Sequence, residues 1–307
     1  MIKRERRTDR SAFKTGGSIW KPLLTATLFI PLNFYWIIVG ETGLVGYALN
    51  TYAVPFYNVI FSLLLLISVN SLFEKVFNRT FFTSSELLSF YTFLSVACAL
   101  PSITFMTLLV TTLGHPFYYA TPENEWQELF LDKLPRWLFV ADRAALKGYY
   151  EGDSTLYTME HIRAWITPII HWTIFTGFLG LVMLCLNLIF REQWVKRERL
   201  SYPIAQLAYR ICTDQRKLFS DKAVMLGFSI SASIDLINGL SFLYPVIPSI
   251  PVKRIGGWRG FGHLFTEKPW SAIGPISMSF YPFVIGLGFL MPLDLAFSSW
   301  FFLIFHK

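Results

Sequence analysis

The feature that most constrains this chain is a set of six long segments almost free of charged side chains. Each is 19 to 37 residues long, and only two of them contain a charge, a single aspartate in each case. A bilayer crossing takes about 20 consecutive apolar residues. The segments are residues 22–40, 51–73, 87–114, 166–190, 223–252 and 269–305. Their number and length predict a polytopic membrane protein with about six spans.

The fold class follows from how the apolar residues are spaced. Only α-helices and closed barrels satisfy every backbone group in lipid, and barrel strands alternate apolar and polar residues over about ten positions. Here apolarity is continuous along each segment, and charged residues are only 15% of the chain. We therefore expect an all-α transmembrane bundle. Pro101 interrupts the third segment, and Pro282 and Pro292 should break the sixth into pieces, one of which re-enters the membrane without crossing.

The distribution of Lys and Arg predicts the topology. With the N-terminus inside, the inside segments carry 18 of these residues and the outside segments carry 9, so the positive-inside rule favours cytoplasmic N- and C-termini. The expected organisation is a basic cytoplasmic tail (1–21), three spans (22–114), an extracytoplasmic loop or cap (115–165), and about three further spans (166–307) that include a basic cytoplasmic loop (191–222).

Residues 115–165 differ in charge from the basic segments. They contain eight Asp and Glu against five Lys and Arg, with helix-like stretches near 125–131 and 136–146. Two interpretations stand side by side, a small cap over the outer mouth and an ordered connection with no role in binding. The chain's net charge of +7 comes mainly from the tail and the 191–222 loop, which indicates contact with anionic lipid headgroups and not with nucleic acid.

Asp235 is the most informative residue of the fifth segment. A charge at mid-bilayer costs roughly 2.5–3.5 kcal/mol on insertion scales, so it must face a cavity, a partner or the bundle. Asn238 follows within one helical turn. We interpret this pair as a substrate or proton site. The alternative is an interhelical hydrogen bond that holds two helices together.

Two further residues are candidates for the same role. Asp294 follows Pro292, and broken helices in transporters expose backbone groups that bind ions and substrates. The alternative for Asp294 is an N-cap of the second half-helix. His171 lies one turn after Pro168 and either titrates near the outer mouth or packs as a hydrogen-bonded histidine. Glu86 and Thr83 have the spacing of a capping box, and Pro203 suits the first turn of a helix.

The sequence gives no positive sign of an enzyme. It lacks a nucleophile elbow, a Walker motif and a metalloprotease motif, and its five His and three Cys lack metal-ligand spacing. Glu160, His161 and Arg163 form the one local cluster that a lipid-modifying enzyme would use. We therefore expect no enzymatic activity, no cofactor and no bound metal.

Short segments from about residue 80 onward resemble a bacterial branch of the oligopeptide-transporter-like superfamily, and they occur in the same order. They are SELL (85–88), REQW (191–194), ERLSYP (198–203), NGL (238–240), KPWS (268–271), FYP (280–282) and the stretch 285–302. Peptide and metal-chelate transporters of that superfamily typically have Ser/Thr-Gly after the Tyr-Pro pair. This chain has Ile204 and Ala205 there.

The resemblance implies a secondary transporter of a small solute, of the peptide or metal-chelate class, possible coupling to protons, and a bacterial cytoplasmic membrane. Such transporters are about twice this length, and the six segments resemble their N-terminal half. A second half-transporter chain or a homo-oligomer is therefore an expected partner, beside the bilayer and the solute. The alternative function is a non-transporting scaffold subunit of a membrane complex.

Overall fold

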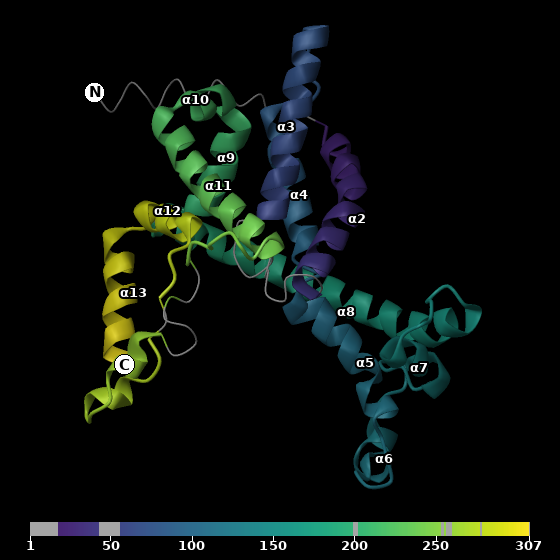
Figure 1. Cartoon of the computed structure of the whole chain (residues 1–307). Coiled ribbons are helices and arrows are strands. Elements are labelled where there is room, and N and C mark those ends of the chain that lie inside the picture. The colour runs from purple at the N-terminus through teal and green to yellow at the C-terminus, as the bar shows by residue number, and fades with distance from the viewer. Residues whose placement is uncertain are drawn as a thin grey trace. The chain divides into compact units, whose positions relative to one another are not determined.

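The computed structural model describes residues 18–42, 56–198, 202–252, 255, 260–276 and 278–306 (Figure 1). These residues are mostly helical, and apart from two isolated bridges they contain no strand, which confirms the all-α fold class. They divide into two compact units. The first lies within Ile19–Ser68 and Ser89–Leu200, and the second lies within Met1–Ser18, Val69–Leu88 and Ser201–Lys307.

Several sequence-based predictions concern residues outside the described ranges. They include most of the basic tail 1–21, most of the 41–50 connection, and the basic residues Lys253, Arg254 and Arg259.

Four helices are long and apolar enough to cross a bilayer. They cover the first, second, fourth and fifth apolar segments, and the chain is accordingly an integral membrane protein. The helices are α2 (Trp20–Thr42), α3 (Tyr57–Phe77), α8 (Met159–Glu192) and α11 (Lys222–Leu243).

The third segment is broken near its proline, as predicted. Helix α4 (Ser84–Cys98) ends shortly before Pro101, a π-helical turn η1 (Ile103–Thr107) follows, and α5 (Leu108–Tyr118) continues from it. Proline has no backbone N–H, and its ring crowds the preceding turn, so a regular helix cannot run through this point.

The sixth segment is also divided by prolines. Helix α12 (Pro282–Leu290) begins with Pro282, and α13 (Leu293–His306) begins directly after Pro292. The two pieces have 9 and 14 residues. At 1.5 Å per residue neither piece spans a hydrocarbon core of about 30 Å. With the third segment also broken, the described residues contain four full-length helices and not the six expected.

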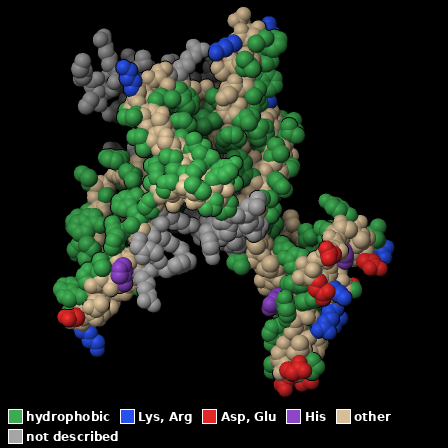
Figure 2. Space-filling view, in the orientation of Figure 1, with side chains coloured by type: hydrophobic (Ala, Val, Ile, Leu, Met, Phe, Trp, Pro, Cys, Tyr) green, Lys and Arg blue, Asp and Glu red, His purple; other side chains and the backbone are tan. Residues whose placement is uncertain are grey.

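In the first unit, α2, α3 and α4 pack through one apolar face each. Phe29 of α2 meets Phe90 of α4 edge to face, with ring centroids 5.4 Å apart. The outer face of α2 repeats an exposed leucine every fourth residue, at Leu24, Leu28 and Leu32, as a lipid-facing stripe would. Figure 2 shows apolar side chains covering much of the visible surface. The buried apolar residues are Ala26, Ile37, Val59, Leu63, Leu66, Ile67, Phe90 and Leu94.

Residues 115–165 fold as an ordered element, which we call the cap. It contains α6 (Trp126–Leu129), η2 (Leu131–Lys133) and α7 (Arg143–Glu151), and it packs on the end of α5 and the start of α8. Its core consists of Leu113, Val140, Leu146 and Trp165. In the view of Figure 2, charged side chains gather over this part of the molecule, at the lower right.

The second helix of the cap starts later than the predicted stretch 136–146. Asp142 is its N-cap, since the carboxylate accepts the N–H groups of Ala144 and Ala145 at 2.9 and 3.4 Å. Before it, the chain is tied to α5 because Val140 N donates to the Leu113 carbonyl oxygen at 3.0 Å. A capping aspartate and this long-range bond hold residues 136–141 out of the helix.

The predicted capping box at the start of α4 is confirmed. Thr83 N donates to Glu86 Oε2 at 2.9 Å, and Glu86 N donates to Thr83 Oγ1 at 3.3 Å. Glu86 is buried, and its second oxygen accepts Ser18 N at 3.2 Å. In the same unit, Pro203 opens α9 (Pro203–Thr213) as predicted, and α10 (Gln215–Ser220) leads into α11.

Candidate functional site

The four predicted site residues belong to two different units. His171 belongs to the first unit, whereas Asp235, Asn238 and Asp294 belong to the second. His171 Nδ1 lies 2.8 Å from the Thr167 carbonyl oxygen, and its ring lies 4.8 Å from that of Trp137. A carbonyl only accepts, so Nδ1 carries the proton and donates. These contacts fit a hydrogen-bonded packing histidine, and a role for His171 in binding or titration stays a prediction.

Asn238 uses both ends of its amide to hold the segment that follows α11. Its Nδ2 donates to the Ile250 carbonyl oxygen at 3.0 Å, and Ile250 N donates back to Oδ1 at 2.7 Å. This pair of bonds ties the chain after Leu243 to its own helix. The amide therefore has a structural task, and a role in binding a solute stays a prediction.

The two aspartates lie on exposed positions. Asp235 is on an exposed face of α11, and Asp294 is in the first turn of α13, where a negative charge suits the helix dipole. Among the described residues neither carboxylate has a hydrogen bond or an ion pair. Both stay predicted coupling residues, and Asp235, within an apolar helix, calls for a partner of some kind.

The structure instead gathers uncharged polar residues inside the first unit. Asn33 of α2, Asn58 and Ser62 of α3, and Cys98 of α4 are all buried, and we call them the amide cluster. Asn58 Nδ2 donates to Asn33 Oδ1 at 2.9 Å and lies 3.5 Å from Cys98 Sγ. Asn33 Nδ2 lies 3.1 Å from Ser62 Oγ, whose hydroxyl donates to the Asn58 carbonyl oxygen at 2.9 Å. The cluster thus joins three helices that pack in the membrane.

One acceptor in this cluster has no donor. Asn33 Nδ2 also donates to the Phe29 carbonyl oxygen at 3.0 Å, which fixes the orientation of that amide and turns its Oδ1 toward Asn58. The atom of Asn58 facing an oxygen must then be its nitrogen, so its own Oδ1 points elsewhere. Asn58 is fully buried, and within the part of the chain that the structure describes neither Asn58 Oδ1 nor the buried Ser95 Oγ of α4 has a hydrogen-bond partner.

The cluster adjoins the break in the third apolar segment. Cys98 is the last residue of α4, and the chain leaves helical geometry between it and η1. Leu100 N donates to the Ala97 carbonyl oxygen in a tightened turn, and Pro101 then offers no donor. The unpartnered polar atoms therefore lie near the end of α4, where the third apolar segment is broken.

The amide cluster was not predicted from the sequence, because it contains no charged residue. One signal was present, since Asn58 and Ser62 are four residues apart on one helical face, and Ser95 and Cys98 are three apart on another. That spacing marks a polar patch within an apolar helix. It does not show that two such patches and Asn33 meet.

A second feature of the first unit is a cavity of about 410 Å³ in the cap. It lies among α5, α7, the loop 152–158 and the start of α8. Its polar lining comes from Ser154, Thr155 and His161. The other lining residues are Val110, Leu113, Ala145, Gly148, Tyr149, Leu156, Trp165 and Ile169.

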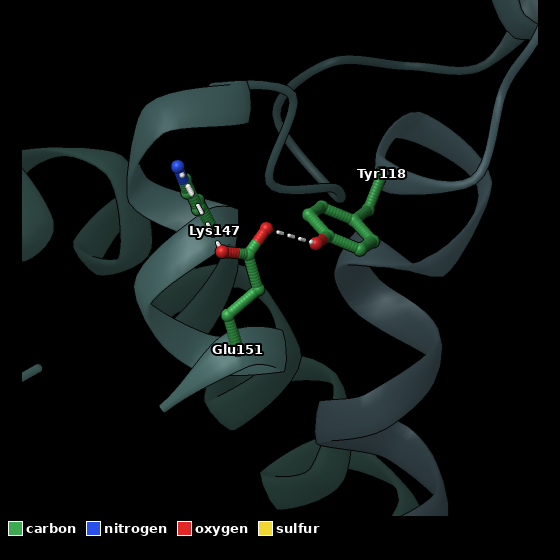
Figure 3. Close-up of polar contacts among 3 residues, drawn as sticks. All are labelled: Tyr118, Lys147 and Glu151. Carbon is green, nitrogen blue, oxygen red and sulfur yellow. Dashed lines mark hydrogen bonds and ion pairs between the residues drawn. The ribbon is translucent and has the colours of Figure 1, made fainter. Parts of the chain in front are cut away.

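Hydrogen bonds from two tyrosine hydroxyl groups join α7 of the cap to α5. Tyr118 donates its hydroxyl to Glu151 Oε1 at 2.8 Å, and Lys147 Nζ lies 3.7 Å from Glu151 Oε2 (Figure 3). The bond to Glu151 raises the pKa of Tyr118. Tyr150 stacks on Tyr118, with ring centroids 4.6 Å apart, and donates its hydroxyl to the Thr111 carbonyl oxygen at 2.7 Å.

The half-buried phenol of Tyr150 makes the cap sensitive to alkali. Burial, aided by Tyr149 and Tyr119, raises the pKa of Tyr150 from 10.0 to about 12. The folded cap therefore holds this proton where the unfolded chain has lost it. The stabilisation is complete below about pH 10 and is lost as the pH rises toward about 12.

We expect cap unfolding, followed by circular dichroism and by tyrosinate absorbance, to become markedly easier across that pH window. Tyr150→Phe should reduce this dependence, whereas Tyr157→Phe, at an 89% exposed position, should leave it unchanged. The same steep loss in both variants would show that Tyr150 is not responsible.

Among the described residues, no three His, Cys, Asp or Glu side chains are placed to hold a metal ion. No curated protein and no solved structure matches this chain. Residues 14–307 match DUF6785, a family of unknown function, and this match extends over nearly all of the sequence. The chain therefore belongs to the DUF6785 family.

Proposed function

We propose that this protein is a secondary transporter, or half of one, for a small solute. The observation that carries the proposal is Asn58 Oδ1, an unpartnered acceptor buried among membrane helices. A buried polar group without a partner costs about 1–3 kcal/mol, and such groups in native proteins call for an explanation. A solute that donates a hydrogen bond during its passage supplies one.

The surroundings of Asn58 fit that role. Ser95 Oγ offers a second unpartnered group, and the break at Pro101 gives the third apolar segment a place to bend. Discontinuous helices at mid-membrane are typical of transporter binding sites. The resemblance of residues 80 onward to oligopeptide-transporter-like proteins supports a solute of the peptide or metal-chelate class. It also supports a bacterial cytoplasmic membrane, where we place the N-terminus inside.

Exposed helices favour a partner that completes the bundle. None of the residues in the most apolar part of α8 or of α11 is buried, and Asp235 lies on an exposed face of α11. Lipid suits the apolar side chains, whereas a carboxylate within the helix needs a polar neighbour. We propose a second half-transporter chain or another copy of this chain there. The competing function, a scaffold subunit, rests on the same exposed helices.

Uptake into proteoliposomes under an inward proton gradient tests the coupling role of Asp235. Radiolabelled di- and tripeptides, with and without a chelated metal, serve as solutes. We expect Asp235→Asn to remove the dependence of uptake on the gradient, because an amide cannot carry the proton. Asp153→Asn is the matched control, since Asp153 is exposed in the cap and its φ of 50° suits asparagine.

Unchanged, gradient-dependent uptake by Asp235→Asn would remove Asp235 from the coupling step. No uptake by the wild-type chain, together with a stoichiometric partner protein in the purified complex, would favour the scaffold.

A further inference from the structure

The cap cavity has the size and lining of a small-molecule site. Ligand pockets in proteins are typically about 300–1,000 Å³ and mostly apolar with a few polar groups. This one has about 410 Å³, and no Asp, Glu, Lys or Arg lines it. A neutral ligand is favoured, because an ion placed there would lose hydration without gaining a counter-charge.

Apolar side chains line this cavity yet stay partly open to solvent. Leu156 is 52% exposed, and Ile169 and Tyr149 are each about two-fifths exposed. Trp165, by contrast, is buried and gives the cavity a rigid aromatic wall. A bound apolar group would cover this surface and release the water against it, which is the driving force for binding.

His161, at the polar end of the cavity, carries one acceptor whose identity its hydrogen bond fixes. His161 Nδ1 lies 2.6 Å from the Thr155 carbonyl oxygen, which can only accept, so Nδ1 carries the proton and donates. In the neutral ring Nε2 is then a bare acceptor, and it has no hydrogen-bond partner among the described residues. The side chain is thus held in one tautomer by the loop that also lines the cavity.

Close packing fixes this end of the cavity. A Cβ added at Gly148 of α7 would overlap the side chain of Ser154 and would press on His161 Cε1. Only glycine lets the loop come so near to α7. Ser154 and His161 therefore pack closely against α7 at this end of the cavity.

We propose that the cap cavity binds a small neutral molecule that has a largely apolar body and one hydrogen-bond donor, which bonds to His161 Nε2. Binding here does not require that the chain be a transporter. The cap is remote in sequence from Asn58, and ligand binding to it is measured without any uptake.

A matched pair of probes tests this chemistry. 2-Naphthol has an apolar body and a donor, and 2-methoxynaphthalene has nearly the same body without the donor. Binding to the full chain in lipid nanodiscs is measured by calorimetry and saturation-transfer NMR, with empty nanodiscs as the blank for partition into lipid. We expect saturable binding and a preference for 2-naphthol of about three- to tenfold, the worth of one hydrogen bond.

Variants separate the acceptor from the apolar body. His161→Phe should bind both probes equally, and Leu156→Trp, which fills the cavity from an exposed position, should weaken both by about tenfold or more. Leu129→Trp is the control, because Leu129 is 58% exposed in the cap and does not line the cavity. No saturable binding above the blank, an unchanged preference in His161→Phe, or equal losses in Leu156→Trp and Leu129→Trp would each overturn the proposal.

Discussion

Replacement of Asn58 by leucine is expected to lower solute uptake by about ten- to hundredfold, the rate equivalent of one buried hydrogen bond to the solute. Leucine has the same branched arrangement of side-chain heavy atoms as asparagine, and it removes both the unpartnered Oδ1 and the Nδ2 that donates to Asn33. The packing of α3 against α2 should survive the loss of the Asn58–Asn33 bond, because Asn33 Nδ2 keeps its bond to the Phe29 carbonyl oxygen and Asn33 Oδ1 can still accept the Ser62 hydroxyl. The bundle should therefore fold while the pathway loses its acceptor.

The matched control is Ser68→Leu on the same helix. Ser68 is exposed, and its hydroxyl bonds to the Leu64 carbonyl oxygen, one turn earlier. It lies outside the amide cluster, so uptake should not change. Thermal unfolding of both variants in nanodiscs shows whether they fold. A folded Asn58→Leu protein with normal uptake would mean that the amide cluster is purely structural.

The second large expected effect is a loss of stability when residues in the core of the cap are replaced. Leu146 is fully buried, and its truncation to alanine should lower the free energy of unfolding by about 2–5 kcal/mol through lost contacts and a cavity. Gly114 of α5 faces it so closely that an added Cβ would overlap Leu146 Cδ2. Gly114→Val should therefore destabilise the cap by about 1–3 kcal/mol through overpacking.

The double variant Gly114→Val/Leu146→Ala shows whether the two side chains share the same space or destabilise the cap independently. The valine occupies space that Leu146→Ala vacates, so the two losses should fall short of additivity by at least about 1 kcal/mol. Pulse proteolysis in urea, following cleavage within 115–165, measures the stability of the cap. Leu129→Ala, at an exposed cap position, should have little effect. Strict additivity would show that Gly114 and Leu146 do not share this space.

Local chemistry explains which features the sequence could predict. Long apolar segments, prolines and the Thr83–Glu86 pair each act through neighbours in the chain. The described residues accordingly show four of the six expected long helices, breaks near the prolines at 101, 282 and 292, and the capping box of α4. The predicted start of the second helix of the cap was wrong by several residues. Its position depends on a hydrogen bond between Val140 and Leu113, which are far apart in the sequence.

The candidate site was harder to predict for a physical reason. A charged residue within an apolar segment stands out in the sequence, because its insertion into lipid costs free energy whatever its neighbours are. Asp235 and Asp294 were predicted as site residues for that reason. Neutral amides and hydroxyls are tolerated, and their importance depends on what they meet. Asn33, Asn58 and Cys98 come from three helices, and only their packing shows that one amide oxygen is left without a donor.

The central claim is that the amide cluster lies on a solute pathway. The reaction of Cys98 with a water-soluble thiol reagent tests this claim most directly, and the test requires no knowledge of the solute. Cys98 is fully buried beside Asn58, whereas the other two cysteines, Cys185 and Cys212, can be replaced by alanine. A charged, membrane-impermeant methanethiosulfonate reagent reacts only with thiols that water reaches. If the amide cluster lies on a solute pathway, Cys98 is modified in intact proteoliposomes as the pathway opens. If Cys98 stays unreacted there but reacts fully after denaturation in detergent, the cluster is static packing and the transport account is wrong.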